Sequence, residues 1–298
     1  MAGGISVADR AGEGAARSAR WPSPSAMVPE HTPTVGESVR TATNSGRHPA
    51  TYKAGADGAP AACARWRREV GLVGKIGYGY GSEWHLLRYL GRHRGELERS
   101  ILKETVGEAI QWRDAPFSVK APYDAEWKGV SFLPDGHPAR AAWLKAWPQT
   151  GNVPNWDAVG VLSGNGISEW LLVEAKAHLS EARSSCAAKP QGGLSDIKRA
   201  LEAVKDDLGV ASTHDWLNGY YQYCNRIALL HFLSVQMVPA RLVFIYFTGD
   251  KRGAREACPR DSAGWFKELR RLDEHIDLPP GHALADRIHR VFLPVTCG

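Results

Sequence analysis

The sequence predicts an α/β fold in which a mixed central sheet is flanked by helices, and three observations carry this prediction. Residues 155–178 read as a β-hairpin, because two strand-like segments flank Asn165-Gly166, a dipeptide that tolerates the positive φ angles of a tight turn. A long apolar helix is expected over 215–238, and the run 241–247 is rich in β-formers, as in a buried central strand. The order hairpin, helix, strand, helix, strand is typical of a mixed sheet covered by helices.

The first 65 residues differ in composition from the rest of the chain. They are rich in Ala, Gly, Ser, Thr, Pro and Arg and contain few large apolar side chains. Such a segment buries too little surface to offset the entropy that it would lose on ordering. We therefore expect a disordered low-complexity tail over 1–65 and a folded domain over 66–298.

Composition and charge narrow the class of protein. The chain has 298 residues, of which 43% are hydrophobic, which is enough for one substantial core. Its net charge of +5 is compatible with a polyanionic partner but does not require one. No run of about 18 apolar residues is present, so no membrane span is expected. The five cysteines are scattered without Cys-x-x-Cys spacing, which favours reduced thiols in a cytoplasm and argues against a zinc site or a disulfide framework.

A first helix is expected directly after the glycine-rich run 77–81. Ser82 is a suitable N-cap, and Glu83 begins a segment with helical character. The glycines are not followed by Gly-Lys-Ser/Thr, so we interpret them as a flexible entry to the helix rather than a phosphate-binding loop. Glu83 at this position would interact favourably with the helix dipole.

The segment between this helix and the hairpin has weaker patterns. We expect helix over 103–112, a break at Asp114-Ala115-Pro116, a short strand over 117–120 and a helix over 139–147. The last of these carries Trp143, Leu144 and Trp147, predicted to share one side. Tryptophans are dense here; stacking on unpaired bases is one use, but packing in a core is the commoner one.

The hairpin turn fixes which residues face each other. If the turn is centred on Asn165-Gly166, paired positions sum to 331, and Asp157 falls directly opposite Glu174. Side chains alternate along a strand, so Glu174 and Lys176 share one face with Leu172 and His178. Like charges that face each other destabilise a sheet, and this pattern therefore indicates a divalent-metal site.

A simpler interpretation of the same residues is a half-buried strand with a solvated Glu/Lys face. The flanking run 170–173 is strongly apolar, which favours a strand covered on both sides. Charges in such a strand need a partner or a metal. We therefore favour the functional interpretation.

The remaining elements are predicted from the spacing of apolar residues and from turn-forming residues. Residues 180–193 are polar and rich in turn formers, so a loop near the site is expected, and an amphipathic helix follows over 196–208. Its apolar positions are Ile197, Leu201, Val204 and Leu208, and its polar face carries Lys198, Arg199 and Lys205. A helix over 266–275, a second over 284–288 and a strand over 291–295 complete the fold.

Asp157, followed by Glu174-Ala175-Lys176 at the end of the next strand, resembles the Asp…(Asp/Glu)-x-Lys signature of the PD-(D/E)XK, or restriction-endonuclease-like, nucleases. The proline of that signature is displaced here, since Pro154 stands three positions before Asp157. The resemblance covers about residues 70–250. It implies a core of helix, three-stranded antiparallel meander, helix and further strand.

The resemblance also implies roles for individual residues. Asp157, Glu174 and the backbone carbonyl of Ala175 would hold Mg²⁺, with Mn²⁺ as a substitute, and Glu83 on the first helix would complete the site. Lys176 would orient or activate the attacking water. Gln222 is a candidate counterpart of a glutamine-led motif on the following helix, although capping of a buried polar network explains it as well. The implied partner is nucleic acid, with DNA favoured, and a homodimer is one option.

Other functional classes remain open. A module that binds nucleic acid without cleaving it is one alternative, and a protein-interaction subunit with a tryptophan surface is another. No Gly-x-Ser-x-Gly, His-Glu-x-x-His or Walker motif is present. His178 fits either a supporting role beside the metal or a structural one, while Cys224 and His231 are expected in the core.

Overall fold

Five strands form the central sheet of the computed structural model, which describes residues 79–117, 124–149, 153–251 and 258–295. The strand order is β1 (Ala109–Trp112), β4 (Ala158–Gly164), β5 (Ile167–Lys176), β6 (Ala240–Thr248) and β7 (Ile288–Pro294). β4 is antiparallel to both of its neighbours, β1 and β5, whereas β5, β6 and β7 run parallel to one another. The predicted α/β class with a mixed sheet is therefore confirmed. The predicted tail over 1–65 lies outside the described residues.

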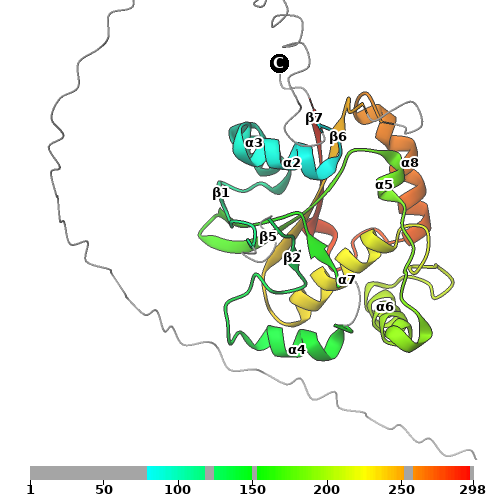
Figure 1. Cartoon of the computed structure of the whole chain (residues 1–298). Helices are drawn as coiled ribbons and strands as arrows, with labels where there is room; N and C mark the ends of the chain where they lie inside the picture. The colour runs from blue at the N-terminus through cyan, green and yellow to red at the C-terminus, as the bar shows by residue number, and fades with distance from the viewer. Residues whose placement is uncertain (1–78, 118–123, 150–152, 252–257, 296–298) are drawn as a thin grey trace, which may run out of the picture. The chain divides into compact units, whose positions relative to one another are not determined.

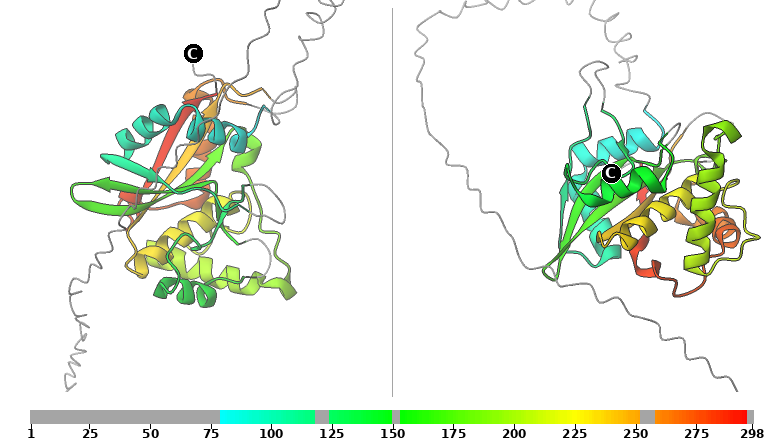
Figure 2. Two further views of the ribbon diagram at one scale, coloured as in Figure 1. Left: turned by 60° about the vertical axis from the view of Figure 1, so that its left-hand side comes forward. Right: turned by 90° about the horizontal axis from the view of Figure 1, so that it is seen from below.

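Helices cover both faces of this sheet (Figures 1 and 2). On one face, α2 (Ser82–Gly91) and α3 (Arg94–Thr105) pack on the side chains of β5, β6 and β7. The opposite face carries α4 (Pro138–Ala146), α6 (Leu194–Leu208), α7 (Tyr221–Val235) and α8 (Ser262–Ile276), which share a larger core with the sheet. No helix among the described residues is long and apolar enough to cross a membrane.

Short elements connect these layers. The two-residue strands β2 (Trp127–Lys128) and β3 (Asn155–Trp156) pair with each other beside the main sheet. The loop expected over 180–193 contains the short helices α5 (Leu179–Ala182) and η2 (Pro190–Gly192). A further short helix, η3 (Ala285–Arg287), precedes β7.

The hairpin has the register that its turn predicts. Ala158 pairs with Val173 and Gly164 with Ile167, so that each pair sums to 331. Asn165 and Gly166 both have positive φ angles, 52° and 73°. The predicted alternation is also correct, because Leu171, Val173, Ala175 and Ala177 face the core under α2 and α3 while Leu172 faces the opposite core.

Five tryptophans among the described residues pack in the core, as expected for this side chain. They are Trp143, Trp147, Trp156, Trp216 and Trp265. Trp143 and Trp147 stack with ring centroids 5.6 Å apart. Leu144, predicted on the same side, is 63% exposed, because a residue next to Trp143 in a helix points about 100° away from it.

Three helix boundaries differ from prediction, each for a local reason. Ser82 is the first residue of α2 and Gly81 is the cap, with a φ of 91° that suits glycine alone. The helix expected over 103–112 ends at Thr105, and Ala109–Trp112 instead pairs with β4 as an edge strand. The helix expected from residue 215 begins at Tyr221, because the Asp215 carboxylate accepts the amide protons of Leu217 and Asn218 and holds a turn there.

Two further expectations were wrong. Lys205 is not on the solvated face of α6 but is buried, and its ammonium group donates to the carbonyls of Ser212 and His214. The helix expected over 284–288 is limited to one 3₁₀ turn, since Ile288 already pairs with Leu242 of β6. In both places a tertiary contact overrides the local pattern.

The turn of the hairpin offers a direct test of the register. Gly166→Ala should destabilise the protein by about 1 kcal/mol, because a side chain disfavours positive φ and a Cβ here meets nothing within 4 Å that would add a steric cost. Urea unfolding monitored by circular dichroism measures the change. Gly95→Ala in α3 is the matched control, since its Cβ also meets nothing and its φ is not positive; equal losses in both variants would contradict the assignment.

Candidate active site

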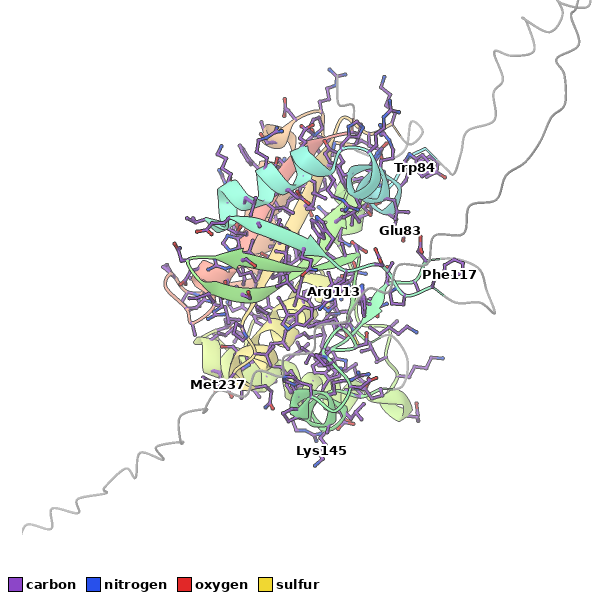
Figure 3. The ribbon with its side chains drawn as sticks, turned by 90° about the vertical axis from the view of Figure 1, so that its left-hand side faces the viewer. Glu83, Trp84, Arg113, Phe117, Lys145 and Met237 are labelled. Carbon is purple, nitrogen blue, oxygen red and sulfur yellow. The ribbon has the colours of Figure 1, made fainter. Side chains whose placement is uncertain are left out.

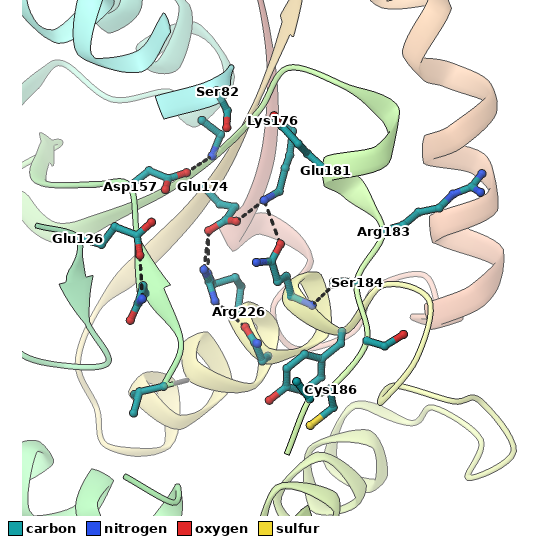
Figure 4. A pocket seen from close by; sticks show the side chains of 18 of the residues that line it. Ser82, Glu126, Asp157, Glu174, Lys176, Glu181, Arg183, Ser184, Cys186 and Arg226 are labelled. Carbon is teal, nitrogen blue, oxygen red and sulfur yellow. Dashed lines mark hydrogen bonds and ion pairs between the residues drawn. The ribbon is translucent and has the colours of Figure 1, made fainter. Parts of the chain in front are cut away.

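A cavity of about 700 Å³ opens where the hairpin, the start of α2 and the N-terminal half of α7 meet (Figure 4). All the residues predicted for the site line it, namely Glu83, Asp157, Glu174, Ala175, Lys176 and Gln222. It also holds carboxylates and cations that the sequence did not single out, namely Glu126, Glu181, Arg183 and Arg226. Its walls are therefore densely charged with both signs.

Asp157 occupies a break between β3 and β4. Its amide donates to the carbonyl of Val173 at 3.0 Å, although Val173 is the ladder partner of Ala158. Two residues thus oppose one, as in a β-bulge, and the ladder stops before the predicted Asp157–Glu174 pair. The expectation of a direct cross-strand pair was wrong, yet the bulge turns the Asp157 side chain into the cavity that Glu174 also lines.

The surroundings of the Asp157 carboxylate disfavour its ionised form. One oxygen accepts the amide proton of Ala175 at 2.7 Å. Burial and the neighbouring charge of Glu174 nevertheless raise the pKa of Asp157 to about 8, against the opposing effect of Lys176. The cavity therefore brings two carboxylates close enough to repel each other, and a cation beside them would relieve this repulsion.

Glu174 lies at the end of β5 and is only 3% exposed. Its Oε1 accepts a hydrogen bond from Lys176 Nζ at 2.6 Å, and its Oε2 is 2.8 Å from both Nε and Nη2 of Arg226. Burial raises the pKa of Glu174, but Arg226 and Lys176 outweigh it and hold the pKa below its ordinary value. Glu174 is therefore ionised at neutral pH.

Lys176 is held by groups from two elements. Besides Glu174, its ammonium group donates to Oε1 of Gln222 on α7 at 3.1 Å. Burial lowers the pKa of Lys176, but the carboxylates of Glu174 and Asp157 raise it above its ordinary value. The lysine is a fixed positive charge, and Gln222 does contact the predicted site.

Arg226 is the main cavity residue to which the sequence assigned no role in the site. It lies one turn after Gln222 on the same face of α7, and its Nη1 donates to Asn225 while its guanidinium lies 5.4 Å from the centre of the Trp156 ring. An arginine inside an apolar helix, four positions from a candidate site residue, is the signal that could have found it. Arg226 joins α7 to the sheet through Glu174.

Two glutamates lie at the more exposed part of the cavity. Glu83 projects from the start of α2 (Figure 3) and lines the cavity, so it lies on the first helix as predicted. Glu126 precedes β2, accepts a hydrogen bond from Asn155 at 2.7 Å and contributes to the raised pKa of Asp157. The sequence around Glu126 has no regular pattern, and only the pairing of β2 with β3 brings it to the site.

Other predicted candidates lie elsewhere. His178 does not line the cavity; its ring nitrogens face Glu181 and Asp250. Cys224 is fully buried in the core as expected. His231 is only partly buried and lies 3.3 Å from the Asp207 carboxylate, so its expected core position was only partly correct.

These features define an α/β protein with a charged cavity in which Asp157, Glu174, Lys176 and Arg226 interact with one another. Comparison of the chain with protein-family models, with curated proteins and with solved structures gave no match. Its function is therefore argued from the cavity itself.

The raised pKa of Asp157 predicts a pH-dependent gain of stability on its replacement. The folded protein keeps the Asp157 proton up to about pH 8, whereas the unfolded chain releases it near pH 4, so wild-type stability falls across this window. Asp157→Asn keeps the acceptor for Ala175 and avoids this loss. We expect it to be more stable than wild type at pH 8 by about 1 kcal/mol or more, and much less so at pH 4.5.

Urea unfolding in the presence of EDTA measures this difference at both pH values. Asp206→Asn on the exposed side of α6 is the matched control and should show no comparable gain. A stability difference for Asp157→Asn that does not grow with pH would contradict the assignment of Asp157 as a strained carboxylate.

Proposed function

We propose that the protein is a Mg²⁺-dependent nuclease that hydrolyses phosphodiester bonds of nucleic acid, with DNA as the favoured substrate. The observation that carries this proposal is the convergence of Asp157, Glu174 and Lys176 in one cavity, with Gln222 on the lysine. These are the residues to which the resemblance to PD-(D/E)XK nucleases assigns metal binding and catalysis.

The arrangement of elements supports the same proposal. Helices α2 and α3 are followed by the antiparallel strands β1, β4 and β5, then by α6 and α7 and by β6, which is parallel to β5. This is the order of helix, meander, helix and strand that the restriction-endonuclease-like fold requires. We therefore propose that fold for the domain.

The donor atoms in the cavity suit magnesium. Mg²⁺ prefers oxygen ligands and keeps several waters, so that one or two carboxylates are enough to hold it. Asp157 and Glu174 would supply those oxygens, with the carbonyl of Ala175 and the carboxylate of Glu83 as further donors in the same cavity. Burial and the charge of Glu174 both raise the pKa of Asp157, and a cation in the cavity would offset both effects.

The cations already on Glu174 are compatible with this role. Each carboxylate oxygen has two lone pairs, so Glu174 can accept from Lys176 and Arg226 and still offer a lone pair to an ion. Rotation of Arg226 away from Oε2 would free that oxygen further. The position of Arg226 therefore determines how readily the Glu174 carboxylate can bind the metal ion.

The chain's own residues account for the remaining chemistry. When bound, Mg²⁺ polarises the scissile phosphate and lowers the pKa of the attacking water. Lys176 orients that water, and its charge stabilises the extra negative charge of the phosphorane. Gln222 holds the ammonium group in place.

One observation favours a second candidate function. Both oxygens of Glu174 are already paired, as in a buried ion-pair network that only stabilises the fold. On this alternative the domain binds nucleic acid or a protein partner without catalysis. Metal-dependent cleavage separates the two.

Cleavage of plasmid, linear and single-stranded DNA and of RNA in Mg²⁺, with an EDTA control, tests the proposal. Lys176→Ala should lower cleavage by at least about 100-fold, because it removes a charge aimed at the transition state, while binding measured in Ca²⁺ should change little. Lys198→Ala on the exposed face of α6 removes the same charge outside the cavity and should cleave like wild type. No metal-dependent cleavage in any format would sink the nuclease proposal.

Metal binding can be measured without turnover. Titration of Mn²⁺ followed by electron paramagnetic resonance should give an affinity at least about 10-fold weaker for Asp157→Asn than for wild type, because an anionic oxygen ligand is lost. Glu181→Gln, also at the cavity but not assigned to the ion, should weaken binding much less. Equal affinities for wild type and Asp157→Asn would mean that the ion binds elsewhere.

A further inference from the structure

A second group of chemically active side chains lies outside the candidate active site. His178 follows β5, Asp250 follows β6 and Cys258 precedes α8, and one possible ligand atom from each lies within 4.8 Å of the other two. His178 and Asp250 are buried and Cys258 is partly exposed. Because β5 and β6 are parallel, the residues that follow them leave the sheet at the same edge.

A carboxylate lies beside one ring nitrogen of His178. Its Nδ1 lies 2.7 Å from Oε1 of Glu181, and the other oxygen of Glu181 accepts the amide proton of Ala177 at 2.7 Å. Nε2 lies 3.0 Å from Asp250 Oδ2, a distance at which a proton or an ion must lie between the two atoms. With an ion in that place, the proton of the imidazole would be on Nδ1, beside Glu181. This carboxylate–histidine arrangement is the one that metal-binding histidines commonly have.

Asp250 is held just as firmly. Its Oδ1 accepts the amide proton of Lys251 at 2.7 Å and lies 3.1 Å from Nε2 of His85, and its Oδ2 accepts the amide proton of Gly81 at 2.9 Å. The carboxylate is therefore positioned by three groups from two segments, the residue that follows it and the start of α2. Two of the three ligand side chains are fixed before any ion arrives.

We propose that His178, Asp250 and Cys258 bind a divalent transition metal of the zinc class. A set of one nitrogen, one oxygen and one sulfur ligand suits zinc, whereas Mg²⁺ and Ca²⁺ prefer oxygen alone. Three protein ligands leave a fourth position of the tetrahedron for water. Such an ion would tie the ends of β5 and β6 to the start of α8.

The geometry requires only a small adjustment. With metal–ligand distances of about 2.0–2.3 Å, ligand atoms of a tetrahedral site lie roughly 3.2–3.8 Å apart. His178 and Asp250 are already about that close, so the closing movement, about 1 Å, falls mainly on the thiolate of Cys258. Partial exposure of Cys258 gives an ion its path into the site.

A proton between His178 and Asp250 is the competing occupant, and metal analysis decides between the two. The full chain, produced without a polyhistidine tag, is analysed for bound zinc and then titrated with Co²⁺ after chelation. We expect about one zinc per chain and a thiolate-to-cobalt charge-transfer absorption in the near ultraviolet, as three or four ligands including one thiolate require. No retained zinc and no such absorption would overturn the proposal.

Two variants locate the ion. Cys258→Ser should lose the charge-transfer absorption and at least about 90% of the bound zinc, because the thiolate is the ligand that selects a soft metal. Cys186→Ser, which changes another partly buried thiol, should keep both. Absorption that persists in Cys258→Ser would assign the metal to a different thiol. Asp157→Asn should keep the absorption, so this result is independent of the nuclease proposal.

Discussion

The buried negative charge of Glu174 is the constraint on which the cavity depends. An ionised carboxylate at 3% exposure needs compensation, and removal of one partner from such a pair typically costs about 3–5 kcal/mol. Lys176 supplies one partner from the same strand, and Arg226 supplies the other from α7. Helix α7 must therefore pack with Arg226 and Gln222 facing the end of β5. The same packing that neutralises Glu174 also forms one wall of the cavity.

The hairpin was predictable because its information is local. Asn165-Gly166 sets the turn, the turn sets the register, and the alternation of Glu174 and Lys176 with small apolar residues assigns the faces. The bulge at Asp157 could not be predicted, since it depends on the hydrogen bond to Val173 across the ladder. Arg226 and Glu126 also escaped prediction, because they reach the cavity from a packed helix and from a two-residue strand that has no pattern of its own.

The two proposed metal sites differ in their donor atoms, and the sequence signals for them differ accordingly. The proposed magnesium site, with its oxygen ligands, has a signal in the hairpin sequence, because the turn places Asp157 and Glu174 near the same end of the hairpin. The spacing of the cysteines argued against zinc, but that argument applies only to ligands that are close in sequence. His178, Asp250 and Cys258 come from three segments that the parallel strands β5 and β6 bring together. Only the fold reveals this grouping, and the proposed zinc site follows from it.

We propose that the carboxylates of Asp157 and Glu174 hold a divalent cation. The most direct test of this proposal is a crystal structure of the wild-type protein soaked in Mn²⁺, with anomalous diffraction to locate the ion. We predict an anomalous peak in contact with carboxylate oxygens of both residues, with Lys176 Nζ facing the waters around it. A map with no peak in this cavity at saturating Mn²⁺, and with Lys176 and Arg226 still paired to Glu174, would contradict the account.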